Sequence, residues 1–311
     1  MKIGISNIGI YLPEKIVTND DLSKTVATND EWISTRTGIK QRHIARKDET
    51  TVDMAVASIN DLIIKSDLNI QDIDFIICST VTNEQKFPSI ATLIQKELKT
   101  PNIPTFDIGP ACTGFVYLLA IAESFVKSGL AKKILCVCSE KFSDIVDWSD
   151  RNTCVLFGDA AAAFIVEENP TTCTILNTNI GGDGVYSELL RTKQQENGKH
   201  FIKMDGTSVF KLAVRIMDEQ VRKICEKSNK SLDDVDLLIP HQANARIMVA
   251  VAERLGIEPF MNVQNYGNTS SVTIPLALVD AMKLGIITKG QLVVSPALGG
   301  GFTWGATLLQ F

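Results

Sequence analysis

Hydrophobic residues follow two different spacings along this chain, and the two spacings alternate. Residues 52–64 and 114–128 carry apolar side chains at the three- and four-residue intervals of a helix, and each stretch precedes a shorter run that is apolar throughout. Continuous apolar runs are typical of strands covered on both faces, so the alternation predicts an α/β fold with buried sheets between helices. Strands are expected at 103–109, 132–140, 160–167, 236–240, 261–267 and 304–311.

The same order of elements occurs twice along the chain. Residues 52–80 resemble residues 209–242, since each passes from an apolar helix through an Asp-rich turn to a strand. Residues 106–140 resemble residues 263–297, since each passes from a strand into a helix and on to another strand. A repeat of this period predicts a duplicated fold. The two halves are expected at 1–169 and 170–311.

Two pairs of residues set the expected register of the repeat. Gly109 aligns with Gly267 and Cys112 with Ser270, both at an offset of 158 residues (267 − 109 and 270 − 112). The segment 181–203 has no counterpart of this kind. It is polar and contains glycine, so we interpret it as an excursion on the surface.

Composition narrows the classes of function. The chain has 311 residues, a formal net charge of −5 and 45% hydrophobic residues, which is typical of a globular protein with a large core. Nucleic-acid binding and membrane-surface binding need basic patches, which this slightly acidic composition does not favour. We see no signal-peptide pattern and no apolar run of membrane-span length, so we expect a cytoplasmic protein without nucleic-acid or membrane partners.

The seven cysteines and three histidines do not form a metal-binding pattern. The chain contains no CxxC pair and its histidines are far apart in sequence, so neither a zinc site nor a disulfide framework is expected. Six of the cysteines are interpreted as reduced core residues. The seventh, Cys112, stands between a Gly-Pro-Ala turn and the apolar helix 114–128.

Three residues that can carry chemistry follow predicted strands: Cys112, His241 and Asn268. Ligands of doubly wound sheets bind outside the carboxyl ends of strands, so the duplication would bring the three together. A thiolate is a nucleophile whose pKa falls at a helix N-terminus, and an imidazole and an amide can both stabilise one developing oxyanion. Each also has an ordinary structural interpretation, as a core thiol, a hydrogen-bonding histidine and a turn residue.

Several longer motifs, in order along nearly the whole chain, carry a family resemblance. They are DEWISTRTGIKQRHIA (30–45), GPACTGF (109–115), DRNTCVLFGD (150–159), KMDGTSVFKLAV (203–214), PHQANARI (240–247), YGNTSS (266–271) and GGGFTWGATLLQF (299–311). With them the chain resembles β-ketoacyl-acyl-carrier-protein synthase III, a condensing enzyme of the thiolase superfamily. The resemblance implies a duplicated thiolase-like fold with two pseudo-twofold-related halves.

The resemblance also implies a reaction that begins type II fatty-acid synthesis. Cys112 would take an acyl group from acyl-CoA, with the N–H groups of Cys112 and Gly300 as the oxyanion hole. Malonyl-acyl-carrier protein would then bind, and His241 and Asn268 would stabilise the enolate left by decarboxylation. Coenzyme A thioesters are substrates in this scheme, so no cofactor or metal is expected, and the protein would be a homodimer.

Further residues receive roles from the same resemblance. The coenzyme A contacts would be Thr28, Trp32, Arg36, Thr37, Arg151, Phe210 and Arg246, with the adenine between Trp32 and Arg151. Phe87 would reach into the acyl pocket of the partner subunit. Lys211, Arg215 and Arg246 would face the acidic carrier protein, although Glu253 stands where relatives often carry lysine.

Departures from the family pattern keep other functions open. Residues 158–164 read GDAAAAF where relatives have more glycine, and Asn83 and Glu84 replace a common Pro and Asp beside the acyl pocket. The alternatives are a condensing enzyme of specialised metabolism with another acyl group or acceptor, and a binding protein on an inactive synthase fold. A degradative thiolase is less favoured, because no cysteine follows Cys225.

Overall fold

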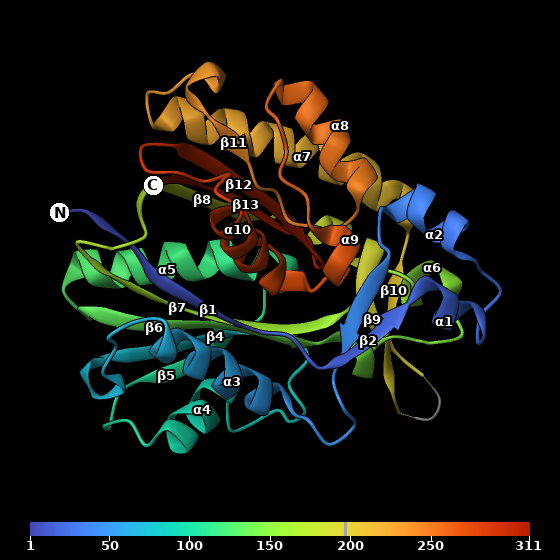
Figure 1. Cartoon of the computed structure of the whole chain (residues 1–311), viewed down its shortest axis with the longest axis horizontal. Coiled ribbons are helices and arrows are strands. Elements are labelled where there is room, and N and C mark those ends of the chain that lie inside the picture. The colour runs from blue at the N-terminus through green and yellow to red at the C-terminus, as the bar shows by residue number, and fades with distance from the viewer. Residues whose placement is uncertain (196–197) are drawn as a thin grey trace.

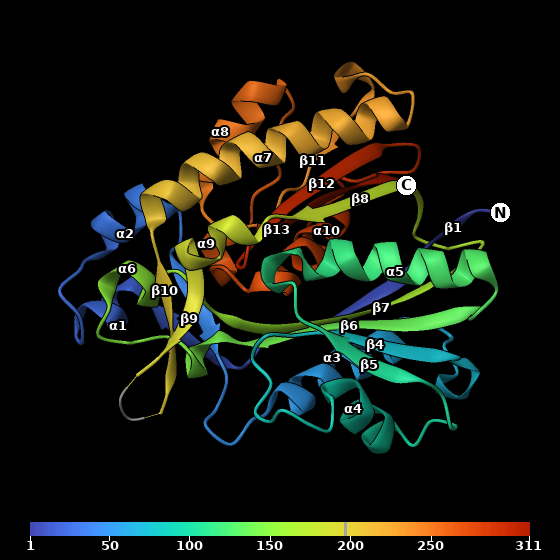
Figure 2. The ribbon, with the colours of Figure 1, turned by 180° about the vertical axis from the view of Figure 1, so that it is seen from behind.

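The structure is a computed structural model that describes residues 1–195 and 198–311. Within these ranges, helices and sheets alternate in five layers (Figures 1 and 2). The helices are α1 (Asn19–Ser23), α2 (Asp30–Thr37), α3 (Thr51–Ile64), α4 (Ile90–Leu98), α5 (Gly114–Ser128), α6 (Arg151–Cys154), α7 (Gly206–Lys227), α8 (Ala245–Leu255), α9 (Val263–Tyr266) and α10 (Thr273–Lys283). The strands are β1 (Ile3–Tyr11), β2 (Lys15–Thr18), β3 (Gln41–Ile44), β4 (Phe75–Ser79), β5 (Thr105–Ile108), β6 (Lys133–Lys141), β7 (Asp159–Glu168), β8 (Cys173–Gly182), β9 (Leu190–Gln194), β10 (His200–Met204), β11 (Leu237–Leu238), β12 (Leu292–Gly299) and β13 (Thr303–Gln310).

The main strands pair in the order β11-β12-β13-β8-β1-β7-β6-β4-β5. The first half of the chain supplies β1-β7-β6-β4-β5 and the second supplies β8-β13-β12-β11, so the same order runs outward from the seam in both directions. β1 and β8 pair over only two residues each, Gly4 with Thr174 and Ile5 with Cys173. Helices α5 and α10 lie between the two sheet portions, α3 and α4 cover one outer face, and α7 and α8 cover the other (Figure 1). The predicted α/β class with sheets between helices is therefore confirmed.

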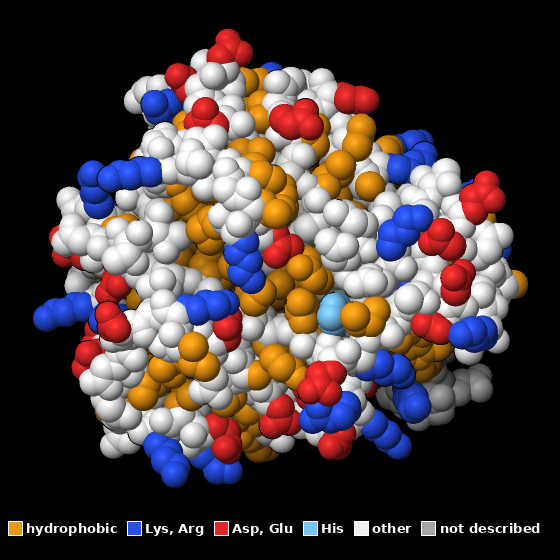
Figure 3. Space-filling view, viewed as in Figure 1, with side chains coloured by type: hydrophobic (Ala, Val, Ile, Leu, Met, Phe, Trp, Pro, Cys, Tyr) orange, Lys and Arg blue, Asp and Glu red, His pale blue; other side chains and the backbone are white. Residues whose placement is uncertain are grey.

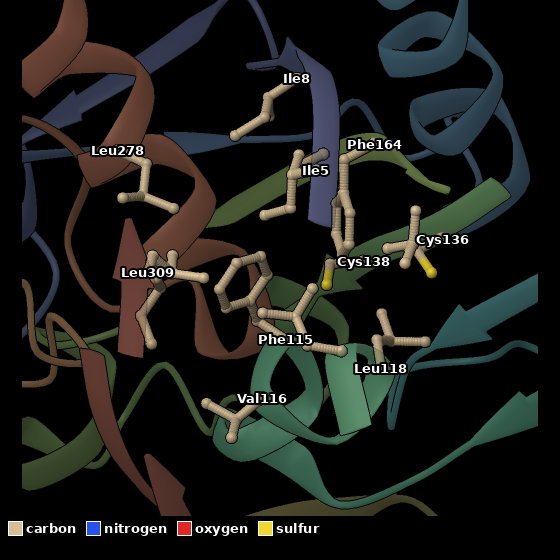
Figure 4. Close-up of a cluster of buried hydrophobic side chains, with 14 of the residues drawn as sticks. Ile5, Ile8, Phe115, Val116, Leu118, Cys136, Cys138, Phe164, Leu278 and Leu309 are labelled. Carbon is tan, nitrogen blue, oxygen red and sulfur yellow. The ribbon is translucent and has the colours of Figure 1, made fainter. Parts of the chain in front are cut away.

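The central helix α5 has the length that the apolar pattern predicts. Gly129 ends it in the left-handed conformation, at φ 75°, where glycine carries no Cβ penalty. Figure 4 shows side chains of α5 packed between the two halves of the core, with Phe115 facing Phe164, and their ring centroids lie 5.2 Å apart. Residues 111–128 are long and apolar enough to span a membrane, but 56% of that segment is buried inside the protein, as in a core helix.

The register of the repeat differs by one residue from the sequence alignment. Ala111 and Ser270 are both non-glycine residues with positive φ, at 53° and 55°. A single-turn 3₁₀ helix starts at each of them, and α5 and α10 then begin at Gly114 and Thr273. These landmarks correspond at an offset of 159 (270 − 111 and 273 − 114). The predicted pairing of Cys112 with Ser270 is therefore wrong, and Ser271 is the counterpart of Cys112.

One further local expectation is wrong and another is incomplete. Residues 261–267 do not form a strand: α9 occupies Val263–Tyr266, because Asn, Gln and Asn side chains favour local turns over a ladder. The segment 181–203 is more than a surface excursion. It contains the end of β8 and the hairpin β9–β10, and side chains of that hairpin line the large cavity described below.

The remaining surface carries charges of both signs. In Figure 3, hydrophobic side chains gather across the middle of the face seen in Figure 1, and Lys, Arg, Asp and Glu are interspersed around them.

The alanines of the 160–163 stretch lie in β7 and are completely buried, so their methyl groups are part of the core and not of the surface.

Candidate active site

A cavity of about 910 Å³ opens where the two halves meet. Its walls come from α2, the loop after β5, the β9–β10 hairpin, the first half of α7 and the turn between β12 and β13. Cys112, His241 and Asn268 all line it, and so does Gly300. The structure thus brings together the three residues that follow separate predicted strands.

Cys112 sits at a tight turn from strand to helix. It follows β5 and Ala111, whose positive φ of 53° is strained for a residue with a Cβ and costs about 1–3 kcal/mol. The side chains of Thr113 and Thr303 both donate to the carbonyl of Pro110, at 2.7 and 2.8 Å, and so fix this turn to β13. The strained turn places Cys112 in the cavity wall with 7% of the residue exposed.

The resting Cys112 thiol is protonated, contrary to the sequence expectation of a lowered pKa. Burial is the main reason that the pKa of Cys112 is raised to about 12; the neighbouring Ser270 hydroxyl acts to lower it and the carboxyl group of Glu140 acts to raise it. Desolvation of the thiolate thus outweighs the favourable helix N-terminus. The nucleophile therefore has to lose its proton as it reacts.

The glycine turn at 299–301 lies close against the nucleophile. A Cβ built on Gly299 would come within 3.0 Å of the backbone nitrogen of Cys112 and 2.6 Å of the Pro110 carbonyl oxygen. Only a glycine tolerates this approach without moving the backbone. The close approach brings the next residue, Gly300, to the wall of the same cavity as Cys112.

His241 is buried at the end of β11. Its backbone N–H donates to the carbonyl of Pro296 at 2.9 Å, and its ring Nδ1 lies 2.6 Å from the hydroxyl of Thr273. Burial lowers the pKa of His241 to about 3, so the ring is neutral at neutral pH. The Thr273 hydroxyl has one proton and two acceptors within reach, the Ser270 carbonyl, to which it donates at 3.0 Å, and the Nδ1 atom of His241. When that proton is donated to Nδ1, the Nε2 atom of His241 carries the ring proton.

The amide of Asn268 has a fixed orientation. Its Oδ1 accepts a hydrogen bond from the backbone N–H of Ser270 at 2.8 Å, which leaves the Nδ2 donor free for a ligand. The backbone of Asn268 bonds to Leu156 and Gly158 at 2.8 and 3.1 Å. Asn268, from the second half, is thus held by a strand-like bridge to the segment before β7.

Two arginines stack on Trp32, which lines the cavity together with Arg36, whereas Arg151 does not line it. The guanidinium carbons of Arg36 and Arg151 lie 4.7 and 4.6 Å from the centroid of the Trp32 ring. Arg151 also donates to the carbonyl of Ala27 at 3.0 Å. The neighbouring Thr28 hydroxyl is buried and has no hydrogen-bond partner in the structure. The cluster offers aromatic and guanidinium planes for stacking and for phosphate binding. Arg151 lies directly on the Trp32 ring, however, so the space predicted for the adenine between these two side chains is closed in this structure.

The other residues named for coenzyme A lie along the same cavity. Thr37, Phe210 and Arg246 line it, and the Arg246 guanidinium lies 5.8 Å from the Phe210 ring. The Thr37 hydroxyl is already bonded to the carbonyl of Ile33 at 2.7 Å, so Thr37 shapes the wall instead of offering a free donor.

The residues named for partner contacts are placed differently. Lys211 lines the cavity, whereas Arg215 is exposed on α7 and forms an ion pair with Glu219 at 2.9 Å. Phe87 is 84% exposed and does not line the cavity of its own chain. Glu84, in the same loop as Phe87, accepts hydrogen bonds from the N–H and hydroxyl of Thr51 and so anchors that loop.

Two polar residues of the site were missed in the sequence. Thr273 lies 32 residues from its partner His241, and nothing in the spacing connects them. Glu140 did leave a signal, because it is a charged residue at the end of the apolar run 134–139. It is completely buried and hydrogen-bonded to Ser270 and Ser271, beside Asn268.

A duplicated α/β fold with a buried cysteine, histidine and asparagine around one deep cavity defines a condensing enzyme of the thiolase fold. Models of the 3-oxoacyl-[acyl-carrier-protein] synthase III family match residues 106–184, and those of its C-terminal part match residues 225–311. The chain is 46% identical to the β-ketoacyl-[acyl-carrier-protein] synthase III of Aquifex aeolicus over 310 residues, which cover 99% of each chain. The chain therefore belongs to the 3-oxoacyl-[acyl-carrier-protein] synthase III family.

Solved structures agree with this assignment. The crystal structure of the Aquifex aeolicus synthase III superimposes with a TM-score of 0.94, covering 99% of this chain and 100% of that one. A priming β-ketosynthase from the R1128 polyketide biosynthetic pathway is 31% identical, with a TM-score of 0.93, and covers 99% of this chain and 96% of its own. The predicted thiolase-like fold and family are both confirmed.

Proposed function

We propose that this protein transfers an acyl group from acyl-CoA to Cys112 and condenses it with malonyl-acyl-carrier protein, with loss of CO2. The observation that carries the proposal is the meeting of Cys112, His241 and Asn268 in one cavity that is also lined by Trp32 and Arg36, with Arg151 stacked on Trp32. The product is a β-ketoacyl-carrier protein, the first intermediate of chain extension. Coenzyme A thioesters are substrates in this scheme, and no cofactor takes part.

The first half-reaction is acylation of Cys112. The sulfur attacks the thioester carbonyl, and the N–H groups of Cys112 and Gly300 stabilise the oxyanion of the tetrahedral intermediate. Collapse of the intermediate forms the acyl-Cys112 thioester and releases coenzyme A as the leaving thiolate. The strained Ala111 turn and the glycine turn at 299–301 fix these donors before the substrate arrives.

The second half-reaction is decarboxylation followed by condensation. His241, protonated at Nε2, and Asn268, through Nδ2, donate to the carbonyl oxygen of the malonyl thioester. Negative charge gathers on that oxygen as CO2 leaves, so both hydrogen bonds strengthen in the transition state. The resulting carbanion attacks the acyl-Cys112 carbonyl and expels the Cys112 thiolate.

The direct test is product formation. Purified protein incubated with an acyl-CoA panel and malonyl-acyl-carrier protein is expected to release free coenzyme A and CO2 and to form a β-ketoacyl-carrier protein, detected by mass spectrometry. Intact-mass analysis before malonyl-carrier protein is added identifies which acyl group loads. Protein that carries no acyl group with any member of the panel would contradict the proposal.

Arg151 offers a test of the coenzyme A site. Replacing it by alanine removes one guanidinium plane beside Trp32, so KM for acyl-CoA is expected to rise about 10-fold while KM for malonyl-carrier protein changes less than about two-fold. Arg215→Ala, also on the surface but in an ion pair outside the cavity, serves as the control for acyl-CoA binding. Equal changes in both KM values for the Arg151 variant would remove Arg151 from the nucleotide site.

We place the carrier protein at the mouth of the cavity and a second copy of the chain at the sheet edge. Lys211 and Arg246 offer positive charge to the acidic carrier, with Arg215 further along α7. β5 ends the sheet order, and the described residues leave its outer edge unpaired. A homodimer joined along β5 would bury the exposed Phe87 and deliver it to the partner's acyl pocket. We place the enzyme in the cytoplasm, where acyl-CoA and carrier protein are available.

A second candidate function has the same two half-reactions but belongs to specialised metabolism and not to fatty-acid synthesis. The likeness to a polyketide-priming ketosynthase favours a role in specialised metabolism, with another acyl group or acceptor. The acyl-CoA panel separates the two, since a strong preference for an unusual acyl group would favour the second candidate.

A further inference from the structure

Glu140 is a buried carboxyl group at the active site that the half-reactions above leave without a role. It lies near the end of β6 with 0% exposure. Its two oxygens are hydrogen-bonded to one backbone N–H and four hydroxyls: Val81 at 3.1 Å, Thr80 at 3.5 Å, Thr82 at 3.1 Å, Ser270 at 3.2 Å and Ser271 at 3.1 Å. A buried carboxylate is expensive without a cation, and these neutral donors only partly offset its desolvation.

The two oxygens of Glu140 face opposite halves of the protein. Oε2 faces the loop 80–82, and Oε1 faces Ser270 and Ser271 in the turn after Asn268. The Ser270 hydroxyl also lies near the sulfur of Cys112, whose pKa it lowers. Because Ser270 donates its one hydroxyl proton to Glu140, the lone pairs of its oxygen remain to accept a proton from the Cys112 thiol. Ser270 therefore connects the nucleophile to a carboxyl group that has no contact with solvent.

The position of Ser270 is strongly constrained. Its φ is 55°, its N–H donates to Asn268 Oδ1 at 2.8 Å, and its carbonyl lies 3.0 Å from the Thr273 hydroxyl. A non-glycine residue keeps a positive φ only where its surroundings impose it. The surroundings of Ser270 thus hold its hydroxyl between Cys112 and Glu140.

We propose that Ser270 and Glu140 accept the proton of Cys112 during acylation and return it when the thiolate is released. This inference rests on the proposed acyl transfer. As the Cys112 sulfur attacks the acyl-CoA carbonyl, its proton moves to Ser270 Oγ and the original Ser270 proton moves to Glu140 Oε1. The Cys112 sulfur–carbon bond forms, the carbon–sulfur bond to coenzyme A breaks, and the electron pair leaves with the coenzyme A thiolate.

The return step closes the proton balance. Condensation breaks the acyl-Cys112 bond and leaves a thiolate on Cys112. The proton held on Glu140 moves back through Ser270, so the enzyme regains its neutral thiol and its carboxylate without a proton from solvent. Ser270 contacts the reacting sulfur, whereas Glu140 acts through Ser270 and is a positioning residue that also stores the proton.

The electrostatics around Glu140 suit a group that gains and loses a proton near neutrality. Burial raises the pKa of Glu140 to about 7, against hydrogen bonds from Val81, Thr82 and the two serines that lower it. The titratable groups that face it are the thiols of Cys78 on β4, Cys112 after β5 and Cys138 on β6. Only ionised Glu140 can accept the proton, so acylation should slow as pH falls through about 7.

Ser271 provides a matched control. It donates to the same Glu140 oxygen at 3.1 Å as Ser270 does at 3.2 Å, but its hydroxyl lies against Cys138 instead of Cys112. S270A and S271A therefore each remove one hydroxyl from Glu140, and only S270A interrupts the path to the nucleophile. E140Q keeps the shape of the side chain and cannot accept a proton.

The experiment measures acylation of Cys112 by rapid quench and intact-mass spectrometry, using an acyl-CoA that loads the wild type, from pH 5.5 to 8.5. At pH 7.5, E140Q and S270A are expected to acylate about 100-fold more slowly, as for loss of a general base, and S271A less than about three-fold. The inflection near pH 7 should be present in the wild type and S271A and absent in E140Q and S270A. Decarboxylation of a malonyl thioester should stay within about three-fold in S270A, as a check on the Asn268 turn.

The outcomes separate this inference from the proposed function. If the wild type is not acylated, the proposed function itself fails. If the wild type is acylated but S270A behaves like S271A in both rate and pH profile, the relay is overturned and the acyl transfer stands. Should E140Q fold poorly, the S270A and S271A pair still decides the question.

Discussion

Replacing Cys112 by alanine is expected to abolish acyl loading and to lower overall condensation by at least about 10⁴-fold, because no other group in the cavity can form the acyl thioester. Cys112 is the cysteine that lines the described cavity, and it stands at a strained turn with the glycine turn at 299–301 against its backbone. Intact-mass spectrometry after exposure to acyl-CoA should show the acyl mass shift in the wild type and not in the variant.

The same variant should keep one activity. His241 and Asn268 remain in place, so decarboxylation of malonyl-carrier protein without condensation is expected to persist and can be followed as CO2 release. Cys154→Ala is a suitable control, since that thiol is buried near the cavity in α6 without lining it. An unchanged mass shift in the Cys112 variant, or its loss in the Cys154 variant, would move the nucleophile elsewhere.

The fold could be predicted from the sequence because its local signals are strong. The apolar helix 114–128 ends at a glycine and matches α5 residue for residue, and the continuous apolar runs at 132–140 and 160–167 became β6 and β7. Helix 3.6-residue periodicity and buried-strand runs depend only on neighbouring residues, so a single chain reveals them. The family motifs then extended the fold prediction to the whole chain.

The predictions that failed concern residues whose structure is set by tertiary contacts and not by the local sequence pattern. The stretch 261–267 alternates like a strand, but the Asn262 amide bonds to Asp280, 18 residues further along the chain, and the backbone closes a helical turn in which the Gly267 N–H donates to the Val263 carbonyl. The one-residue error in the repeat arose for a similar reason. Matching residue types suggested Cys112 with Ser270, whereas the positive φ of Ala111 and Ser270 sets the true correspondence.

The reactive residues of the site could be predicted from the sequence, but the residues that hydrogen-bond to them and hold them in place could not. Cys112, His241 and Asn268 could be chosen because each follows a strand-like run and because the motifs name them. The pKa of Cys112 could not be predicted, because it depends on how completely the folded protein excludes water from the thiol. The rise in pKa caused by burial is larger there than the decrease expected from the helix N-terminus. Thr273 and Glu140 act through contacts between residues 32 and 130 positions apart, which no spacing rule identifies.

Replacing His241 by alanine is expected to separate the two half-reactions. Decarboxylation of malonyl-carrier protein should fall about 10²- to 10³-fold, the usual loss when one preorganised donor to a developing oxyanion is removed. Acylation of Cys112 should change less than about three-fold, because the proposed oxyanion donors of that step are the backbone N–H groups of Cys112 and Gly300. Radiolabelled CO2 release and intact-mass acylation, measured on the same preparation, report the two steps independently.

The burial of His241 makes a pH prediction that distinguishes a hydrogen-bond donor from an acid–base group. Its pKa is lowered to about 3, so the ring stays neutral from pH 5 to 9 and its contribution to decarboxylation should not vary over that range. Asn268→Ala, which removes the other donor, should reproduce the loss of decarboxylation with acylation intact. Equal loss of both half-reactions in the His241 variant would instead make His241 the base that activates Cys112, and would leave Ser270 and Glu140 without the proton they are proposed to hold.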